Sequence, residues 1–234
     1  MIPSSVTRAR TEVLVNEFVR SVYNWMCIGL ALTGFLAYYV STSPELMKLI
    51  FGNPILFFGL IIGELAMVFA ISGWVERMSP AMATGLFVGY SALNGVTLSV
   101  IFLAYTQASI FSTFFICSAT FACCSVYGWT TKKDLTSWGG FLTMGLIGII
   151  IASVVNMFIR SNAMTMILSY IGVIVFVGLT AYDTQKIKNL ALTQPVDADG
   201  SVVRRLAIVG ALTLYLDFIN LFLMLLRILG SRRE

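Results

Sequence analysis

Seven apolar stretches constrain the fold of this 234-residue chain more than any other feature. They fall at about 22–41, 54–74, 80–103, 108–129, 139–159, 164–185 and 206–229. A helix that crosses the hydrocarbon core of a bilayer needs about 20 predominantly apolar residues. Short connections with proline, glycine or charged residues separate the stretches. The sequence therefore predicts an all-α, polytopic membrane protein with seven transmembrane helices.

Composition supports this class and excludes several functions. The chain is 58% hydrophobic and only 11% charged, whereas a soluble domain is nearer half apolar and a quarter charged. Its net charge of +4 comes from lysines and arginines on the connections, and no basic stretch interleaved with aromatic residues predicts nucleic-acid binding. The chain has no histidine, which excludes histidine-containing zinc sites and Ser-His or Cys-His nucleophile pairs. The four cysteines all lie in apolar stretches and are predicted to be small buried hydrophobes.

The domain organisation is predicted to be simple. Residues 1–21 are expected to form a cytoplasmic N-terminal tail, 22–230 the seven-helix transmembrane domain and 231–234 a short C-terminal tail. Most of the 15 lysines and arginines lie in the first tail and in the connections on the same side as it, which places the N-terminus inside. Seven full crossings then place the C-terminus outside. A re-entrant last segment would bring the C-terminal charges inside, and it stays an alternative.

The last apolar stretch carries an aspartate in its middle. A carboxylate at bilayer depth is expensive unless it faces other polar groups or water. At 3.6 residues per turn, the polar and small residues of this stretch share one stripe, while leucine and phenylalanine cover the rest. The stripe consists of Gly210, Thr213, Asp217, Asn220, Met224 and Arg227. A helix with an apolar coat and a polar seam is expected at the centre of a bundle.

Three acidic residues, Glu64, Asp183 and Asp217, lie inside predicted spans. An ionisable residue at membrane depth marks a functional site by default, and the alternative is a hydrogen bond to a neighbouring helix. Asp217 lies about 16 Å along its helix, and Asp183 lies near the inner end of the preceding one. The two are expected to meet and to share a proton. Such a pair can act as a latch that protonation controls, as a Ca²⁺ site or as the catalytic pair of a hydrolase.

Arg77 ends the second predicted span on the same side as Asp183. It lies about 20 Å of helix from Glu64, at 1.5 Å per residue. The arginine is predicted either to latch the aspartates in their ionised form or to anchor the helix at the inner interface. Glu64, Thr213 and Asn220 are expected to support the aspartate pair with further polar groups.

Two motifs in the last two spans resemble the transmembrane Bax inhibitor motif family (Bax inhibitor-1-like), in its bacterial inner-membrane branch. They are Tyr182-Asp183-Thr184-Gln185-Lys186-Ile187 and Leu214-Tyr215-Leu216-Asp217-Phe218-Ile219-Asn220-Leu221-Phe222. The Gly63-Glu64-Leu65-Ala66-Met67 run and the segment count extend the resemblance over nearly the whole chain.

The resemblance implies a last helix wrapped by the other six, in an inner-membrane, multi-pass protein. It also implies a pH-sensitive Ca²⁺ leak governed by an aspartate pair, which Asp183 and Asp217 match. An arginine in the family engages that pair, but its position falls near Val75, two residues before Arg77. Eukaryotic relatives are linked to cell-death suppression, and bacterial ones to restraint of a membrane protease.

Three functions follow as hypotheses. The first is passive cation conduction, chiefly of Ca²⁺, gated by protonation of Asp183 and Asp217, with no enzyme activity and no cofactor beyond the ion. The second is a regulatory interaction protein that binds a membrane protease or stress partner through the N-terminal tail. The third is an intramembrane aspartyl protease, because Tyr182-Asp183 is similar to one motif of those enzymes. Their second motif, Gly-x-Gly-Asp, is replaced here by bulky residues before Asp217.

Overall fold

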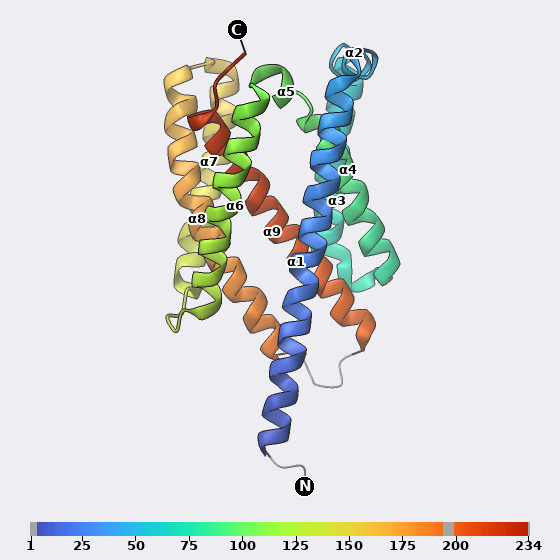
Figure 1. Cartoon of the computed structure of the whole chain (residues 1–234), viewed down its shortest axis with the longest axis vertical. Coiled ribbons are helices and arrows are strands. Elements are labelled where there is room, and N and C mark those ends of the chain that lie inside the picture. Colours follow the sequence, from blue (N-terminus) through green and yellow to red (C-terminus); the bar gives the residue numbers. More distant parts are fainter. Residues whose placement is uncertain (1–3, 194–198, 234) are drawn as a thin grey trace. The chain divides into compact units, whose positions relative to one another are not determined.

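A computed structural model describes residues 4–193 and 199–233, with side chains from residue 13 onward. Its elements are helical throughout (Figure 1). They are α1 (Ser4–Thr42), α2 (Pro44–Phe51), α3 (Pro54–Trp74), the 3₁₀ turn η1 (Val75–Arg77), α4 (Pro80–Leu98), α5 (Ile101–Ala104), α6 (Gln107–Thr130), α7 (Thr136–Ile159), α8 (Asn162–Thr193) and α9 (Gly200–Leu229).

Local sequence explains where α2, α3 and α4 begin. Each has proline in its first turn, where the missing N–H is not needed for helical bonding. The residue before each proline, Ser43, Asn53 or Ser79, accepts a hydrogen bond from a backbone N–H of that first turn. The connections in this part of the chain are therefore fixed by proline and capping residues together.

Seven helices in the described part of the chain are long and apolar enough to cross a membrane. The last, Gly200–Leu229, is unbroken, so it offers no support for a re-entrant segment. In its most apolar window 67% of the residues are buried, against 6% to 39% in the other six. The prediction of an all-α bundle with the C-terminal helix at its centre is confirmed.

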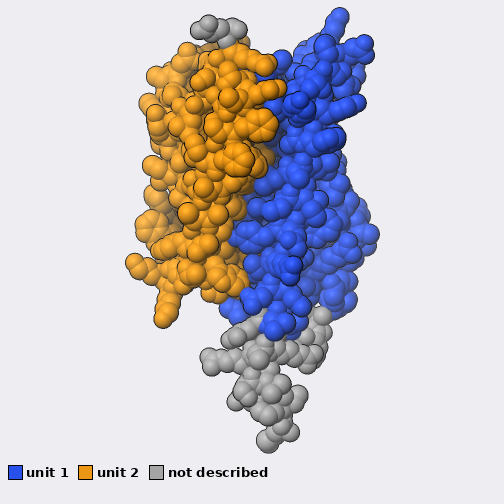
Figure 2. Space-filling view, in the orientation of Figure 1, with its two compact units in different colours: residues 1–104, 190–215 blue, residues 105–189, 216–234 orange. Residues whose placement is uncertain are grey.

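The chain divides into two compact units, and both include part of α9 (Figure 2). Unit 1 comprises residues 1–104 and 190–215, and unit 2 comprises 105–189 and 216–234. In unit 1, α1 packs mainly against α4, and α4 also packs against α3, the helix before it in the chain. In unit 2, α6 approaches the backbone of α8 at Gly128, and α7 approaches the Tyr182 ring of α8 at Gly139.

Three predicted boundaries differ from the structure. The helix of the first span begins before the predicted residue 22, because residues 4–21 are helical and continuous with it, and their polar residues lower the mean hydropathy without preventing a helix. The cytoplasmic placement of these residues stays a prediction. The connection 44–51 forms the short helix α2, which buries Met47 and Ile50 against Val40. The helices α8 and α9 extend beyond the predicted spans, to Thr193 and from Gly200, because polar helix ends are invisible to an apolar-length criterion.

The prediction that all four cysteines are buried is wrong for three of them. Cys117 is fully buried, but Cys27 and Cys123 are exposed on their helices and Cys124 is half-buried. The error has a physical reason, since in a membrane an apolar side chain is as stable on the lipid-facing surface as in the interior.

Candidate functional site

Asp183 on α8 and Asp217 on α9 come together in the interior of unit 2. Their side chains are 7% and 5% exposed, and they are hydrogen-bonded to each other. The two residues are 34 positions apart in the sequence, and the antiparallel course of α8 and α9 brings them to one level. The predicted meeting of the two aspartates is therefore present in the structure.

The hydrogen bond between these carboxyl groups has a chemical consequence. An ionised carboxylate only accepts hydrogen bonds, so the two groups can be hydrogen-bonded to each other only while one of them carries a proton. The second oxygen of Asp217, Oδ2, is buried and has no hydrogen-bond partner in the described residues. The site therefore places two carboxyl groups side by side with one unsatisfied oxygen, which is a costly arrangement in a low-dielectric interior.

Close helix packing holds Asp183 in place. Gly128 of α6 lies directly against the backbone carbonyl of Ala181, where a methyl group would clash. Gly139 of α7 lies in the same way against the ring of Tyr182. Both contacts fall within two residues of Asp183, so α6 and α7 fix the height and rotation of α8 at the site.

The end of α8 that follows Asp183 is clasped to the loop between α6 and α7. The side-chain amide of Gln185 accepts from the N–H of Leu135 and donates to the carbonyl of Lys133, both at 2.8 Å. The ammonium of Lys188 donates to the carbonyl of Trp129 at 2.7 Å and lies 5.1 Å from the centre of its ring. Lys186 lies close enough to interact electrostatically with Asp183. This clasp was not predicted, although Gln185 lies inside the motif that was singled out.

Glu64 belongs to a separate hydrogen-bonded network in unit 1. Its carboxylate accepts from Thr97 Oγ1 at 2.8 Å and from Asn94 Nδ2 at 3.5 Å. Asn94 Oδ1 accepts from the hydroxyl of Tyr215 at 3.2 Å, and that hydroxyl lies 2.7 Å from Thr33 Oγ1. The alternative interpretation of Glu64, a hydrogen bond to a neighbouring helix, is present in the structure. Tyr215 was missed as a site residue, although a tyrosine in the middle of a span needs a partner for its hydroxyl.

The predicted supporting residues of the polar seam bond to their own helix. Thr213 donates to the carbonyl of Val209 at 3.0 Å, and Asn220 donates to that of Leu216 at 2.8 Å. Both side chains are half-buried. Their part in supporting the aspartates stays a prediction.

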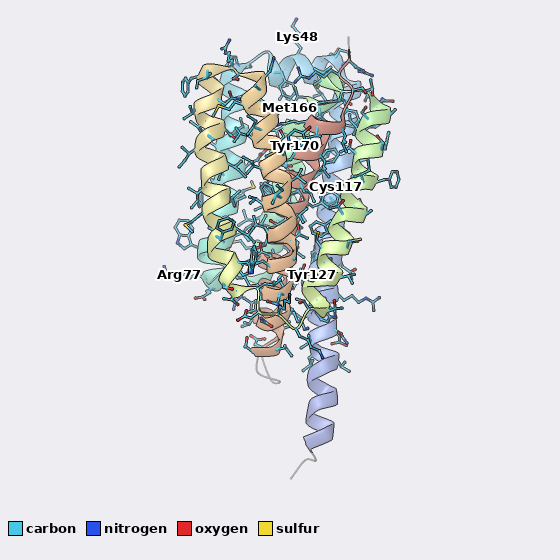
Figure 3. The ribbon with its side chains drawn as sticks, turned by 90° about the vertical axis from the view of Figure 1, so that its left-hand side faces the viewer. Lys48, Arg77, Cys117, Tyr127, Met166 and Tyr170 are labelled. Carbon is cyan, nitrogen blue, oxygen red and sulfur yellow. The ribbon has the colours of Figure 1, made fainter. Side chains whose placement is uncertain are left out.

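Arg77 lies in η1, and its side chain is exposed (Figure 3). This exposure suits the interface-anchor interpretation, and the latch stays a prediction. A different arginine, Arg205 at the start of α9, donates to the carbonyls of Glu76 and Met78 at 3.3 and 2.9 Å. Arg205 thereby ties the turn between α3 and α4 to the last helix.

The predicted Ca²⁺ ligands supply two carboxylates. Among residues 13–193 and 199–233, no three histidine, cysteine, aspartate or glutamate side chains gather closely enough to hold a metal ion. Ca²⁺ takes six to eight oxygen ligands, so hydroxyls, carbonyls or water would have to complete the coordination.

Residues 15–234 match the family described as "Inhibitor of apoptosis-promoting Bax1". The chain is 50% identical over 232 residues to the Escherichia coli "Inner membrane protein YbhL", covering 99% of this chain and 98% of that protein. It is 48% identical over 230 residues to an "Uncharacterized protein" of Borreliella burgdorferi, covering 98% of each. With seven candidate spans, this chain is a multi-pass inner-membrane protein that belongs to the Bax inhibitor-1 family.

Proposed function

We propose that this protein conducts Ca²⁺ passively and that the protonation of Asp183 and Asp217 gates the conduction. The observation that carries the proposal is the hydrogen bond between the two buried carboxyl groups. No other pair of acidic side chains in the described chain is hydrogen-bonded in the interior of a span. The proposal makes the protein a channel and not an enzyme.

The gating follows from the charge on the pair. With a proton shared, the two carboxyls are joined and carry at most one negative charge. Without it, two like charges face each other in a low-dielectric interior and repel. Deprotonation therefore breaks the contact between α8 and α9 and frees up to four oxygens for a divalent cation. Protons and Ca²⁺ compete for the same atoms, which makes conduction sensitive to pH.

The test is Ca²⁺ flux into liposomes that contain the protein and a trapped Ca²⁺ dye. The wild-type flux should rise between about pH 6 and pH 8, because the loss of the shared proton separates the two carboxyls. Asp217→Asn keeps a hydrogen bond to Asp183 that does not depend on a shared proton. Its flux should therefore stay, at every pH, at the level that wild type shows at acid pH. Asp134→Asn, which changes an exposed carboxyl in the α6–α7 loop, is the matched control. A pH response that survives in both Asp183→Asn and Asp217→Asn would contradict the proposal.

A second candidate is binding of a protease or stress partner through the N-terminal segment. The helical residues before the apolar part of α1 favour it, because they form a continuous polar helix that could serve as a handle. Deleting residues 2–18 should abolish partner binding and leave Ca²⁺ flux unchanged. The two functions can coexist in one protein.

The surroundings of Asp217 weigh against an intramembrane protease. Its neighbours Tyr215 and Phe218 are 0% and 4% exposed, so a substrate strand would meet bulky buried side chains instead of bare backbone. Cleavage of a transmembrane substrate that is lost in Asp183→Ala would contradict this assignment. We further propose a cytoplasmic N-terminus and an external C-terminus, which reporter fusions at both ends can test.

A further inference from the structure

Two hydroxyl groups on α6 are buried without a partner. Apart from Asp217 Oδ2, Thr113 Oγ1 and Ser125 Oγ are the only buried side-chain oxygen or nitrogen atoms of the described chain that lack a hydrogen bond. Thr113 is 0% exposed and Ser125 is 8% exposed. All three orphaned atoms lie in unit 2, on α6 and on the half of α9 that belongs to that unit.

The orphaned hydroxyls are unusual for this chain. A serine or threonine in a helix commonly donates to the carbonyl four residues earlier. Ser118, Thr120 and Thr130 of the same helix do so, at 2.8, 2.9 and 2.7 Å. Thr113 and Ser125 do not, although the same helical geometry is open to them. Each of these two oxygens therefore keeps unused hydrogen-bonding capacity inside unit 2.

These hydroxyls lie on the face of α6 that meets α9. Thr113, Cys117, Phe121 and Ser125 are spaced four residues apart, and all four are buried. Cys117, labelled midway along α6 in Figure 3, donates through Sγ to the carbonyl of Phe218 at 3.7 Å. Phe218 is the residue after Asp217, so this face passes directly beside the aspartate pair.

An aromatic contact divides this face between the two hydroxyls. The ring of Phe218 lies 5.4 Å from that of Phe121 and 5.6 Å from that of Phe114, measured between centroids. Thr113 precedes this cluster along α6, and Ser125 follows it. The interior therefore has one unsatisfied hydroxyl on each side of an apolar barrier, and the aspartate pair lies next to the barrier.

We propose that Thr113 and Ser125 are oxygen ligands for a partly hydrated cation on its path through unit 2, one on each side of the Phe121–Phe218 barrier. This proposal deepens the proposed function and rests on it. Hydroxyl oxygens are ligands that a hard cation such as Ca²⁺ accepts. They would supply part of the coordination that two carboxylates leave incomplete.

Ca²⁺ flux in liposomes tests the proposal with matched variants on one helix. Thr113→Val and Ser125→Ala should each lower the flux by about fivefold to tenfold, the effect of losing one hydrogen bond or ligand. Thr113→Ser keeps the hydroxyl and should retain the flux. Ser118→Ala and Thr120→Val remove hydroxyls that bond to their own helix, and they should leave the flux unchanged. If hydroxyls on α6 affected the flux only through the stability of the fold, Ser118→Ala and Thr120→Val would lower it, because they remove hydrogen bonds. Thr113→Val and Ser125→Ala would then leave it unchanged, because they remove hydroxyls that have no partner.

Thiol labelling gives a readout that is independent of flux. With the native cysteines replaced by alanine, Thr113→Cys and Ser125→Cys should react with a small cationic thiosulfonate in membranes, and Thr120→Cys should not. Unreactive cysteines at both positions, or unchanged Ca²⁺ flux in Thr113→Val and Ser125→Ala, would overturn the proposal. A loss of proton flux with unchanged Ca²⁺ flux in these two variants would also overturn it, because it would assign the hydroxyls to a chain of water molecules. In these cases a pH response abolished by Asp217→Asn still supports the proposed function, so the two failures are distinguishable.

Discussion

The hydroxyl of Tyr215 lies 2.7 Å from the hydroxyl of Thr33, although 182 residues separate them in the sequence. Thr33 also donates to the carbonyl of Ser91 at 2.8 Å. The Thr33 proton is therefore committed to that carbonyl, so the Tyr215 hydroxyl is the donor in this network, to Asn94 or to Thr33. This contact ties the first and last helices of unit 1 to α4, and it is fully buried.

Removing that hydroxyl should weaken the fold. Tyr215→Phe leaves Asn94 Oδ1 without its donor and should lower the free energy of unfolding by about 0.5–2 kcal/mol. For a chain of this size the melting temperature in detergent should fall by about 2–6 °C. Tyr39→Phe, at a residue that is 56% exposed, should leave the melting temperature unchanged and serves as the control. Equal melting temperatures for the two variants would show that the buried network contributes nothing to stability.

The contact between Gly128 and Ala181 predicts a strong effect from one methyl group. A Cβ at position 128 would overlap the carbonyl of Ala181, and backbone cannot move aside as a side chain can. Gly128→Ala should therefore lower the free energy of unfolding by about 1–3 kcal/mol. Gly148→Ala in α7 has open space around the new methyl group and should stabilise its helix by about 0.5–1 kcal/mol. Thermal unfolding of both variants gives the comparison, and destabilisation in both would argue against the close contact.

The Gln185 clasp predicts the behaviour of the α6–α7 loop under protease. Gln185→Leu removes both hydrogen bonds to the loop, and Lys132 and Lys133 offer trypsin two sites within it. Trypsin should cut there about tenfold faster, because the open form of the loop gains population. Gln185→Glu keeps the acceptor for Leu135 and should show a smaller increase. An unchanged cleavage rate in Gln185→Leu would mean that Lys188 and the close helix packing hold the loop without it.

Asp134 in the same loop predicts a dependence on acid pH. Hydrogen bonds from Thr136, including its N–H at 2.9 Å, lower the pKa of the Asp134 carboxyl below its ordinary value. A group with a lowered folded-state pKa contributes stability that is present above its unfolded pKa and is lost as the pH falls through the folded value. The advantage of wild type over Asp134→Ala in melting temperature should therefore shrink below about pH 4. Asp134→Asn keeps the acceptor oxygen and should show little of this pH dependence. A constant difference at every pH would contradict the role of the charge.

The parts of the fold that depend on apolar length were predictable, and those that depend on helix rotation were not. The seven spans follow from runs long enough to cross hydrocarbon, and Asp183 and Asp217 stand out because a carboxylate there is costly. The partners of Tyr215 could not be predicted, because α1, α4 and α9 must first be packed to show which side chains face each other. The prediction for the cysteines was wrong for a related reason. Hydropathy cannot separate an exposed residue such as Cys123 from a buried one such as Cys117.

The division of α9 between the two units bears on how the chain is made. Unit 1 needs residues 190–215 and unit 2 needs 216–234, so neither can close before this last helix leaves the translocon. Until then Asp183 lies in the membrane without Asp217, and both units lack the part of α9 that belongs to them. Folding of both units therefore depends on one late step, the insertion of α9. Nascent chains that stop before residue 200 should be substrates for quality-control proteolysis.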